Sequence, residues 1–180
     1  MMQPMPRVPP FDRPATYEDL VALPDTLVAE IVGGELHASP RPAPPHTETG
    51  AVVGGRLVPP FHEGRGGPGG WRILYEPEIH LGPDIVVPDW AGWRHDRMPV
   101  LPNAAFITQA PDWACEIISP STGAIDRSRK MRIYAREGVG HLWLIEPLAR
   151  TLEIYRLDTE RRWVVANNFG DDDVVRAEPF

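Results

Sequence analysis

Short apolar runs separated by glycine and proline dominate the chain, and this pattern predicts a protein built largely of β-strands. Two glycines at 33–34 supply the positive φ of a tight turn and predict a β-hairpin. Three strands in quick succession after residue 70 predict a meander. The expected strands are 27–32, 35–39, 71–76, 78–81, 85–90, 113–118, 141–146, 152–157, 163–166 and a strand-like run at 174–180.

Helices are expected in three places. Thr16 is a suitable N-cap for a short helix that Pro24 ends. Residues 46–58 are small and apolar, and their glycines fit a helix only if close packing compensates for them. A basic segment that begins after Thr122 reads as a helix terminated by Gly138.

Composition limits the classes of protein to consider. The net charge of −7 argues against a protein that coats nucleic acid, because such proteins neutralise phosphates with excess basic residues. No apolar run approaches the ~20 residues of a membrane-spanning helix, and the N-terminus lacks the apolar region of a secretory signal. A single cysteine rules out an internal disulfide, so we expect a soluble, cytoplasmic protein.

The chain divides into two parts of unequal length. The proline-rich residues 1–14 predict a flexible arm, and residues 15–180 fit a single domain. Within that domain, residues 94–112 read as a long loop. Loops of this length in compact domains are usually functional or mobile, so we expect this one to flank a site.

Glu116 lies in the middle of the most apolar strand and needs a compensating group, because a buried ionised carboxylate is costly. Asp89, which ends another strand, is the candidate partner. Two carboxylates on neighbouring strands, with the backbone carbonyl of Ile117, can hold Mg²⁺ or Mn²⁺. Lys130 completes the candidate catalytic set Asp89, Glu116 and Lys130 as a charge-stabilising cation.

Spacing alone leaves alternatives open for these residues. Asp126 and Lys130 are four residues apart on the expected helix and fit a surface ion pair equally well. Glu30 is either a solvated strand residue or an auxiliary acid, and His46 is either a substrate contact or a helix-entry residue. The scattered histidines and the single cysteine argue against zinc as the metal. The auxiliary candidates are Glu30, His46, Glu78, Asp126 and Tyr134.

The basic face of the helix is the candidate nucleic-acid contact. Its arginines are spaced to contact phosphates, although a solvated helix face is the alternative. These residues are Arg127, Arg129, Arg132 and Arg136.

At these motifs the chain resembles the Uma-type restriction endonuclease family of the PD-(D/E)XK nuclease superfamily. The resemblance rests on residues 29–36, 87–89, 115–122, 126–130, Tyr134 and 138–144. It implies an α/β (α+β) restriction-endonuclease-like core, in which a central mixed sheet is flanked by helices and preceded by a helix and a β-hairpin.

The resemblance also implies roles for individual residues. Asp89 takes the place of the superfamily's first acid, Glu116 of the second, and Glu30 of an auxiliary acid. The usual lysine position is occupied by Ile118, so Lys130 is expected to reach the site from the helix. Pro83-Asp84 is a competing Pro-Asp pair, but it lies in the turn before the strand.

The function that the resemblance implies is metal-dependent hydrolysis of DNA phosphodiesters, with a homodimer as a reasonable assembly. A non-catalytic nucleic-acid-binding or protein-binding module that kept the nuclease fold is the alternative, and the acidic net charge favours it. Family members tend to continue beyond the point where this chain ends, so residues 174–180 are expected to form an incomplete last strand.

Overall fold

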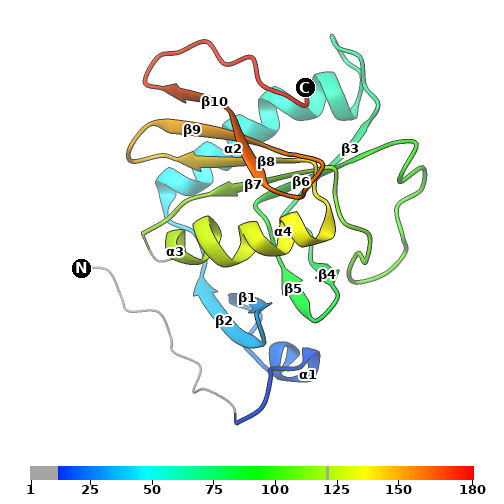
Figure 1. The fold of residues 1–180 in the computed structure, drawn as a ribbon, viewed down its shortest axis with the longest axis vertical. Helices are drawn as coiled ribbons and strands as arrows, with labels where there is room; N and C mark the ends of the chain where they lie inside the picture. The colour runs from blue at the N-terminus through cyan, green and yellow to red at the C-terminus, as the bar shows by residue number, and fades with distance from the viewer. Residues whose placement is uncertain (1–11, 121) are drawn as a thin grey trace.

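Two β-sheets lie one above the other in Figure 1, and helices pack on both faces of the larger sheet. This computed structural model describes residues 12–120 and 122–180. The larger sheet has six strands in the order β10-β9-β8-β7-β6-β3, and the smaller has four in the order β2-β1-β5-β4. The expected mixed sheet flanked by helices, with a preceding helix and hairpin, is confirmed.

The smaller sheet contains β1 (Leu27–Val32), β2 (Glu35–Pro40), β4 (Ile79–Leu81) and β5 (Asp84–Val86). The larger sheet contains β3 (Trp71–Tyr75), β6 (Trp90–Arg94), β7 (Trp113–Ile117), β8 (His141–Glu146), β9 (Thr151–Leu157) and β10 (Trp163–Gly170). The helical segments are α1 (Tyr17–Val21), α2 (Pro44–Leu57), η1 (Val58–His62), α3 (Gly123–Ile125), η2 (Asp126–Lys130) and α4 (Met131–Glu137).

The N-terminal elements follow the local signals in the sequence. Thr16 and Asp19 form a reciprocal capping box at the start of α1. Gly33 and Gly34 have φ values of 63° and 80°, which produce the tight turn between β1 and β2. The expected helix and hairpin are therefore confirmed.

β7 is one of the two central strands of the larger sheet, and all five of its residues are buried. It pairs antiparallel with β6 and parallel with β8, with α3, η2 and α4 between β7 and β8 in the chain. Successive side chains of a strand point to opposite faces. Trp113 and Cys115 pack in the cluster that includes Leu57 of α2, whereas Ala114 packs with Tyr134 of α4. Glu116 consequently faces the α4 side.

The glycines of α2 allow this helix to lie directly against the larger sheet. A Cβ at Gly54 would come within 2.5 Å of the Trp90 ring, and a Cβ at Gly50 would lie 3.6 Å from Ile117. Close packing thus compensates for the low helix propensity of glycine. The expected helix over 46–58 is confirmed, with α2 covering residues 44–57.

Three expectations about the strands are wrong. The meander does not exist as one sheet, because β3 belongs to the larger sheet while β4 and β5 belong to the smaller one. The expected strand 85–90 is divided between β5 and β6, and Asp89 lies in the connection just before β6. Residues 174–180 form no strand, because Phe180 folds back onto the rings of Trp71 and Trp113.

The long loop is observed at nearly its expected bounds. Strand β6 takes its first residue, Arg94, and the remainder packs on β3, β4 and β6 through the Ile79–Ile107 bridge and the contact of Arg72 with Met98. Among the described residues, no hydrogen bond or ion pair joins this segment to Glu116 or Lys130. The predicted flexible arm lies, for residues 1–11, outside the described residues.

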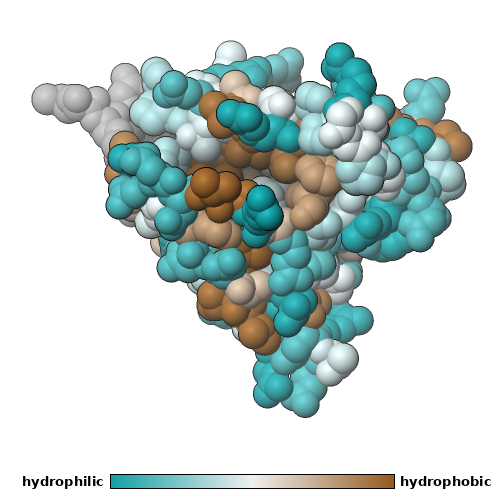
Figure 2. Space-filling view, turned by 90° about the horizontal axis from the view of Figure 1, so that it is seen from above, coloured by the Kyte–Doolittle hydropathy of each residue, from teal (hydrophilic) through white to brown (hydrophobic). Residues whose placement is uncertain are grey.

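The surface carries hydrophobic groups among hydrophilic ones, as Figure 2 shows for the face seen from above. The most exposed large hydrophobic residues are Val174, Val100 and Leu148, at 81%, 77% and 72%. Such dispersed apolar residues are normal for a globular protein. Within 12–120 and 122–180, no helix has the length and apolar character needed to cross a membrane.

Candidate active site

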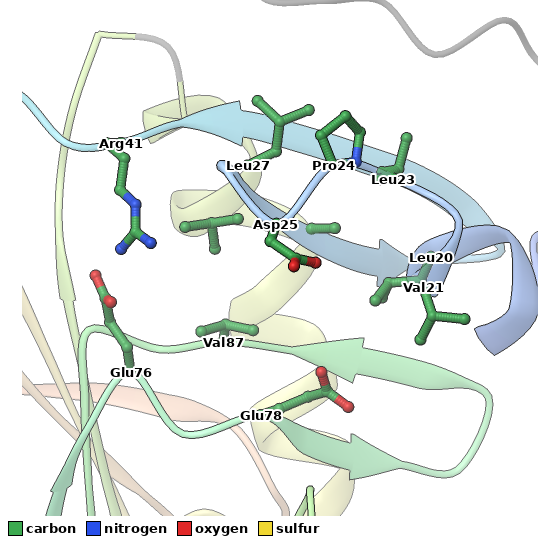
Figure 3. A pocket seen from close by; sticks show the side chains of 12 residues that line it. Leu20, Val21, Leu23, Pro24, Asp25, Leu27, Arg41, Glu76, Glu78 and Val87 are labelled. Atoms are coloured by element: carbon green, nitrogen blue, oxygen red, sulfur yellow. The ribbon is translucent and has the colours of Figure 1, made fainter.

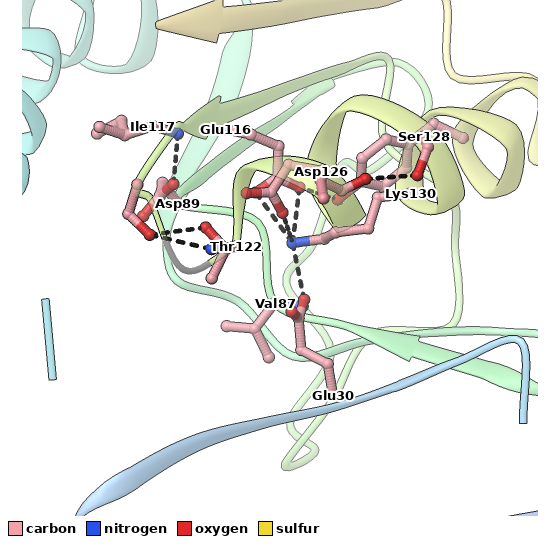
Figure 4. Close-up of polar contacts among 12 residues, drawn as sticks. Glu30, Val87, Asp89, Glu116, Ile117, Thr122, Asp126, Ser128 and Lys130 are labelled. Atoms are coloured by element: carbon pink, nitrogen blue, oxygen red, sulfur yellow. Dashed lines mark hydrogen bonds and ion pairs between the residues drawn. The ribbon is translucent and has the colours of Figure 1, made fainter. Parts of the chain in front are cut away.

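Lys130 lies at the centre of a buried group of carboxylates (Figure 4). Its Nζ is 2.9 Å from Glu30 Oε1, 3.0 Å from Glu116 Oε1 and 3.4 Å from Asp126 Oδ1. Lys130, Glu116 and Asp126 are 2%, 3% and 3% exposed. Three carboxylates around one ammonium group leave an excess of negative charge in a region with little water. We call Glu30, Asp89, Glu116, Asp126 and Lys130 the acidic cluster.

Two side chains donate hydrogen bonds to the Glu116 carboxylate. Lys130 Nζ donates to Oε2 at 3.0 Å, and the Tyr134 hydroxyl donates to Oε1 at 2.5 Å. Burial raises the pKa of Glu116 well above its ordinary value; the charge of Lys130 opposes this, and neighbouring carboxylates add to it. Burial lowers the pKa of Lys130, but the carboxylates outweigh burial and raise it well above its ordinary value. Lys130 is therefore the cation that holds Glu116 in place.

Asp89 lies beside the end of β7 and is more open to solvent than Glu116. Its Oδ2 accepts the backbone N–H of Ile117 at 2.6 Å. Its Oδ1 is 3.0 Å from His46 Nε2, and the two side chains are 13% and 14% exposed. Burial lowers the pKa of His46, but the hydrogen bond and charge of Asp89 outweigh burial and raise it. His46 thus contacts a predicted site residue while also opening α2.

The pairing of β6 with β7 explains why Asp89 and Glu116 are close. Trp90 pairs with Cys115 in antiparallel register, so the residue before β6 lies next to the end of β7. Glu30 arrives from β1 of the smaller sheet, where the Val87 N–H donates to its Oε1 at 2.7 Å. The same oxygen contacts Lys130, so Glu30 connects the smaller sheet to the helical segment η2.

The helical segment η2 directs Asp126 and Lys130 into the protein. It is a short π-helical turn, a wider winding that often occurs at functional sites. Both residues are buried, which excludes the surface ion pair that their spacing allowed. The sequence contains no clear signal for this turn, because a π-helical turn shifts the helix face relative to ordinary helical spacing.

The acidic cluster has the donor chemistry that Mg²⁺ or Mn²⁺ prefers, namely carboxylate oxygens. A carboxylate offers about four lone-pair sites. Glu116 uses three of these on Lys130 and Tyr134, and Asp89 uses two on Ile117 and His46, so both can accept a further ligand bond. In the described part of the chain, no three histidine, cysteine, aspartate or glutamate side chains converge as a metal cage. Such a cation would therefore have to use these two carboxylates with carbonyl or water oxygens.

Of the predicted catalytic, metal-binding and auxiliary residues, the structure brings all but one together. Glu78 bonds to His80 Nε2 at 2.7 Å and does not contact the acidic cluster. The residues that are brought together are Glu30, His46, Asp89, Glu116, Ile117, Asp126, Lys130 and Tyr134.

Three of the four arginines proposed to contact phosphates have carboxylate partners within the protein. Only Arg132, which is exposed, lacks an ion-pair partner among the described residues. The pairs are Arg127 with Glu146 and Glu153, Arg129 with Glu35, and Arg136 with Asp84 and Glu137.

The competing Pro-Asp pair has a different position. Asp84 is 2% exposed, and its Oδ1 accepts the Gly33 N–H at 2.6 Å. This hydrogen bond holds the turn between β1 and β2 in place.

Sequence reasoning missed Glu76, whose N–H donates to the Asp89 carbonyl at 3.0 Å and so supports the Pro88-Asp89 segment. Glu76 has a φ of 45°, in the left-handed region. This conformation is uncommon for glutamate, so the sequence does not predict it.

Comparisons with known proteins establish the fold and the family of this chain. A crystal structure from Anabaena variabilis described as that of a "putative nuclease" matches with a TM-score of 0.72 and 24% identity, over 91% of this chain and 88% of that chain. At that identity the likeness establishes the fold. No curated protein matches the chain significantly. The sequence profile "Uma2: Putative restriction endonuclease" matches residues 14–180, and the chain belongs to this family.

Proposed function

We propose that this protein is a metal-dependent endonuclease that hydrolyses phosphodiester bonds of DNA. Asp89, Glu116 and the carbonyl of Ile117 would hold Mg²⁺ or Mn²⁺. When bound, the ion would lower the pKa of a water and stabilise charge on the phosphate oxygens. The observation that carries the proposal is the acidic cluster itself, in which buried carboxylates outnumber the one lysine.

Lys130 acts in this proposal mainly through Glu116. Its ammonium group has ion pairs with Glu30, Glu116 and Asp126, so its three donors are already used. Its ion pair and hydrogen bond orient the Glu116 carboxylate, and a direct contact with phosphate would require one of these pairs to open. His46 holds the Asp89 carboxylate from the other side.

Plasmid nicking tests the assignment. We expect the protein to nick supercoiled DNA with Mg²⁺ or Mn²⁺, to stop in excess chelator and to recover when the metal is returned. Glu116→Gln and Asp89→Asn keep the side-chain shapes and should each lower the rate about 100-fold or more, since the ligand charge contributes several kcal/mol to the transition state. Glu160→Gln, at an exposed pair with Arg162, is the matched control and should nick normally.

The same assay can overturn the proposal. Circular dichroism first shows that each variant is folded. Equal nicking by the protein and by both site variants would make the active-site assignment wrong. If calorimetry detects no Mg²⁺ or Mn²⁺ binding and no nicking occurs, the metal-dependent nuclease proposal fails.

A non-catalytic binding module is the second candidate. The specific observation that favours it is the internal pairing of Arg127, Arg129 and Arg136, which leaves few free cations for phosphates and so favours the protein-binding form of this candidate. Retained binding of a protein partner by a folded protein that does not nick would support it.

A further inference from the structure

A pocket of about 370 Å³ opens beside the acidic cluster, between α1 and β1 on one side and the segments after β3 and β5 on the other (Figure 3). This volume is in the range of small-molecule pockets, roughly 300–1,000 Å³. The pocket is lined by Leu20, Val21, Leu23, Pro24, Asp25, Leu27, Val28, Ala29, Arg41, Glu76, Glu78 and Val87.

Two wall residues connect the pocket to the acidic cluster by hydrogen bonds. The Val87 N–H bonds to Glu30, the partner of Lys130, and the Glu76 N–H bonds to the Asp89 carbonyl. Val87 precedes Asp89 by two residues, which span about 7 Å of extended chain. Stacked nucleotides rise about 3.4 Å each, so the pocket is within about two nucleotides of a phosphate at Asp89.

The walls of the pocket combine apolar surface with carboxylates. Val21, which is 57% exposed, adds apolar surface to this wall beside Leu20 and Leu23. Glu78 is held in place by His80, whose ring stacks on Phe106 at 3.7 Å between centroids. Arg41 and Glu76 point toward one another across one side of the pocket (Figure 3).

The charge of the pocket selects against phosphate. Asp25, Glu76 and Glu78 outnumber Arg41, so an anionic group would be repelled. A flat ring with N–H donors on its edge fits both the apolar walls and the acceptors. Unpaired nucleobases have this combination of features.

We propose that the pocket binds an unpaired guanine close to the bond to be cleaved. This inference rests on the proposed nuclease function, because that function is what places a nucleic-acid strand beside Asp89. Guanine presents N1–H and N2–H₂ side by side, and the two oxygens of one carboxylate can accept both. Among the carboxylates of the pocket, we assign this role to Glu78, because its hydrogen bond with His80 fixes its orientation.

The other bases match this set of acceptors less well. Adenine and cytosine each present one amino group beside a ring acceptor, and a carboxylate repels that acceptor. Thymine has a single N–H between two carbonyl groups. The expected order of affinity is guanine, then adenine and cytosine, then thymine.

Fluorescence anisotropy in excess chelator tests this order without cleavage. The probes are labelled short thymidine oligonucleotides that differ only in one central base. We expect the guanine probe to bind about tenfold or more tightly than the all-thymine probe, the discrimination typical of a bidentate contact. Glu78→Gln still accepts the His80 hydrogen bond, and it should remove most of this preference. Asp25→Asn tests an exposed wall residue, and Glu160→Gln is the control.

The outcomes separate this inference from the proposed function. A guanine preference that Glu78→Gln abolishes supports the pocket even if the plasmid is not nicked. Equal binding of all four probes overturns the pocket, also when nicking by the acidic cluster is normal. A preference that survives in both Glu78→Gln and Asp25→Asn places the base elsewhere and likewise overturns the inference.

Discussion

At the scale of single residues, the neighbours of Glu116 determine its burial and its hydrogen bonds. Strand alternation turns its carboxylate toward α4, where water is excluded. Lys130 and Tyr134 supply the hydrogen bonds that make this burial possible. A buried charge that loses one of its partners is strongly destabilised, so each donor contributes to stability as well as to the site.

Removing the hydroxyl of Tyr134 tests this contribution. Tyr134→Phe leaves the ring in the core but takes one of the donors away from Glu116. We expect the free energy of unfolding to fall by about 1–3 kcal/mol, measured by urea denaturation.

Tyr155→Phe is the matched control, because its hydroxyl also donates to a carboxylate, Glu153, at a half-buried position. It should cost less than Tyr134→Phe, since water can replace the lost donor there. Equal losses from the two variants would show that the burial of Glu116 is not what makes its hydrogen bond important.

The sequence revealed the chemistry of this site better than its geometry. An acid in an apolar strand and a lysine on the next helix were sufficient to nominate Glu116 and Lys130. The sequence could not show that Glu30 and Asp126 would share the same ammonium group, because that arrangement depends on how two sheets and a π-helical turn meet. For the same reason it could not place Glu76 beside Asp89.

At the scale of elements, local signals predicted where strands and helices occur but not which sheet each strand joins. Strand 141–146 and helix α1 follow from apolar runs and capping residues. Residues 79–86 have similar local patterns to β3, yet they join the smaller sheet, where β5 pairs with β1, about fifty residues earlier in the chain. Pairings over such distances depend on packing, so a run of three strands was mistaken for one meander.

The helix from Gly123 to Glu137 illustrates the same limit, because three of its four arginines bind the protein's own carboxylates. Arg127 contacts Glu146 on β8 and Glu153 on β9. Burial would raise the pKa of Glu153, but hydrogen bonds from Tyr155 and Arg127 prevail and lower it. A lowered folded-state pKa means that this stabilisation is present above the ordinary pKa of glutamate and is lost as the pH falls through the folded-state value.

Arg127→Ala should therefore be destabilising in a pH-dependent manner. We expect a loss of about 0.5–1 kcal/mol near pH ~7 and a smaller loss near pH ~3, measured by urea unfolding at both values. Arg132→Ala, on the same helix and without an ion-pair partner among the described residues, should change stability little at either pH. A loss of equal size at both pH values would assign the effect of Arg127 to packing of its aliphatic stem instead.

At the scale of the whole molecule, one helix joins the two sheets. From the segment between Asp126 and Glu137, Lys130 reaches Glu30, Arg129 reaches Glu35 and Arg136 reaches Asp84. All three carboxylates belong to the smaller sheet, which also carries much of the pocket wall. The position of Glu30 in the acidic cluster therefore depends on contacts that lie outside the cluster itself.

The Arg136–Asp84 pair offers the clearest test of this connection. The two groups are 2.9 Å apart, and Asp84 is 2% exposed, so Arg136→Ala leaves a buried carboxylate with the Gly33 N–H as its remaining hydrogen-bond donor among the described residues. We expect a loss of about 1–3 kcal/mol in the free energy of unfolding. Amide hydrogen exchange should become faster in the smaller sheet, at 27–40 and 79–86, while β7 and β8 stay protected. Arg132→Ala is again the control. Faster exchange spread evenly over both sheets would mean that the helix does not hold the smaller sheet in place as a separate unit.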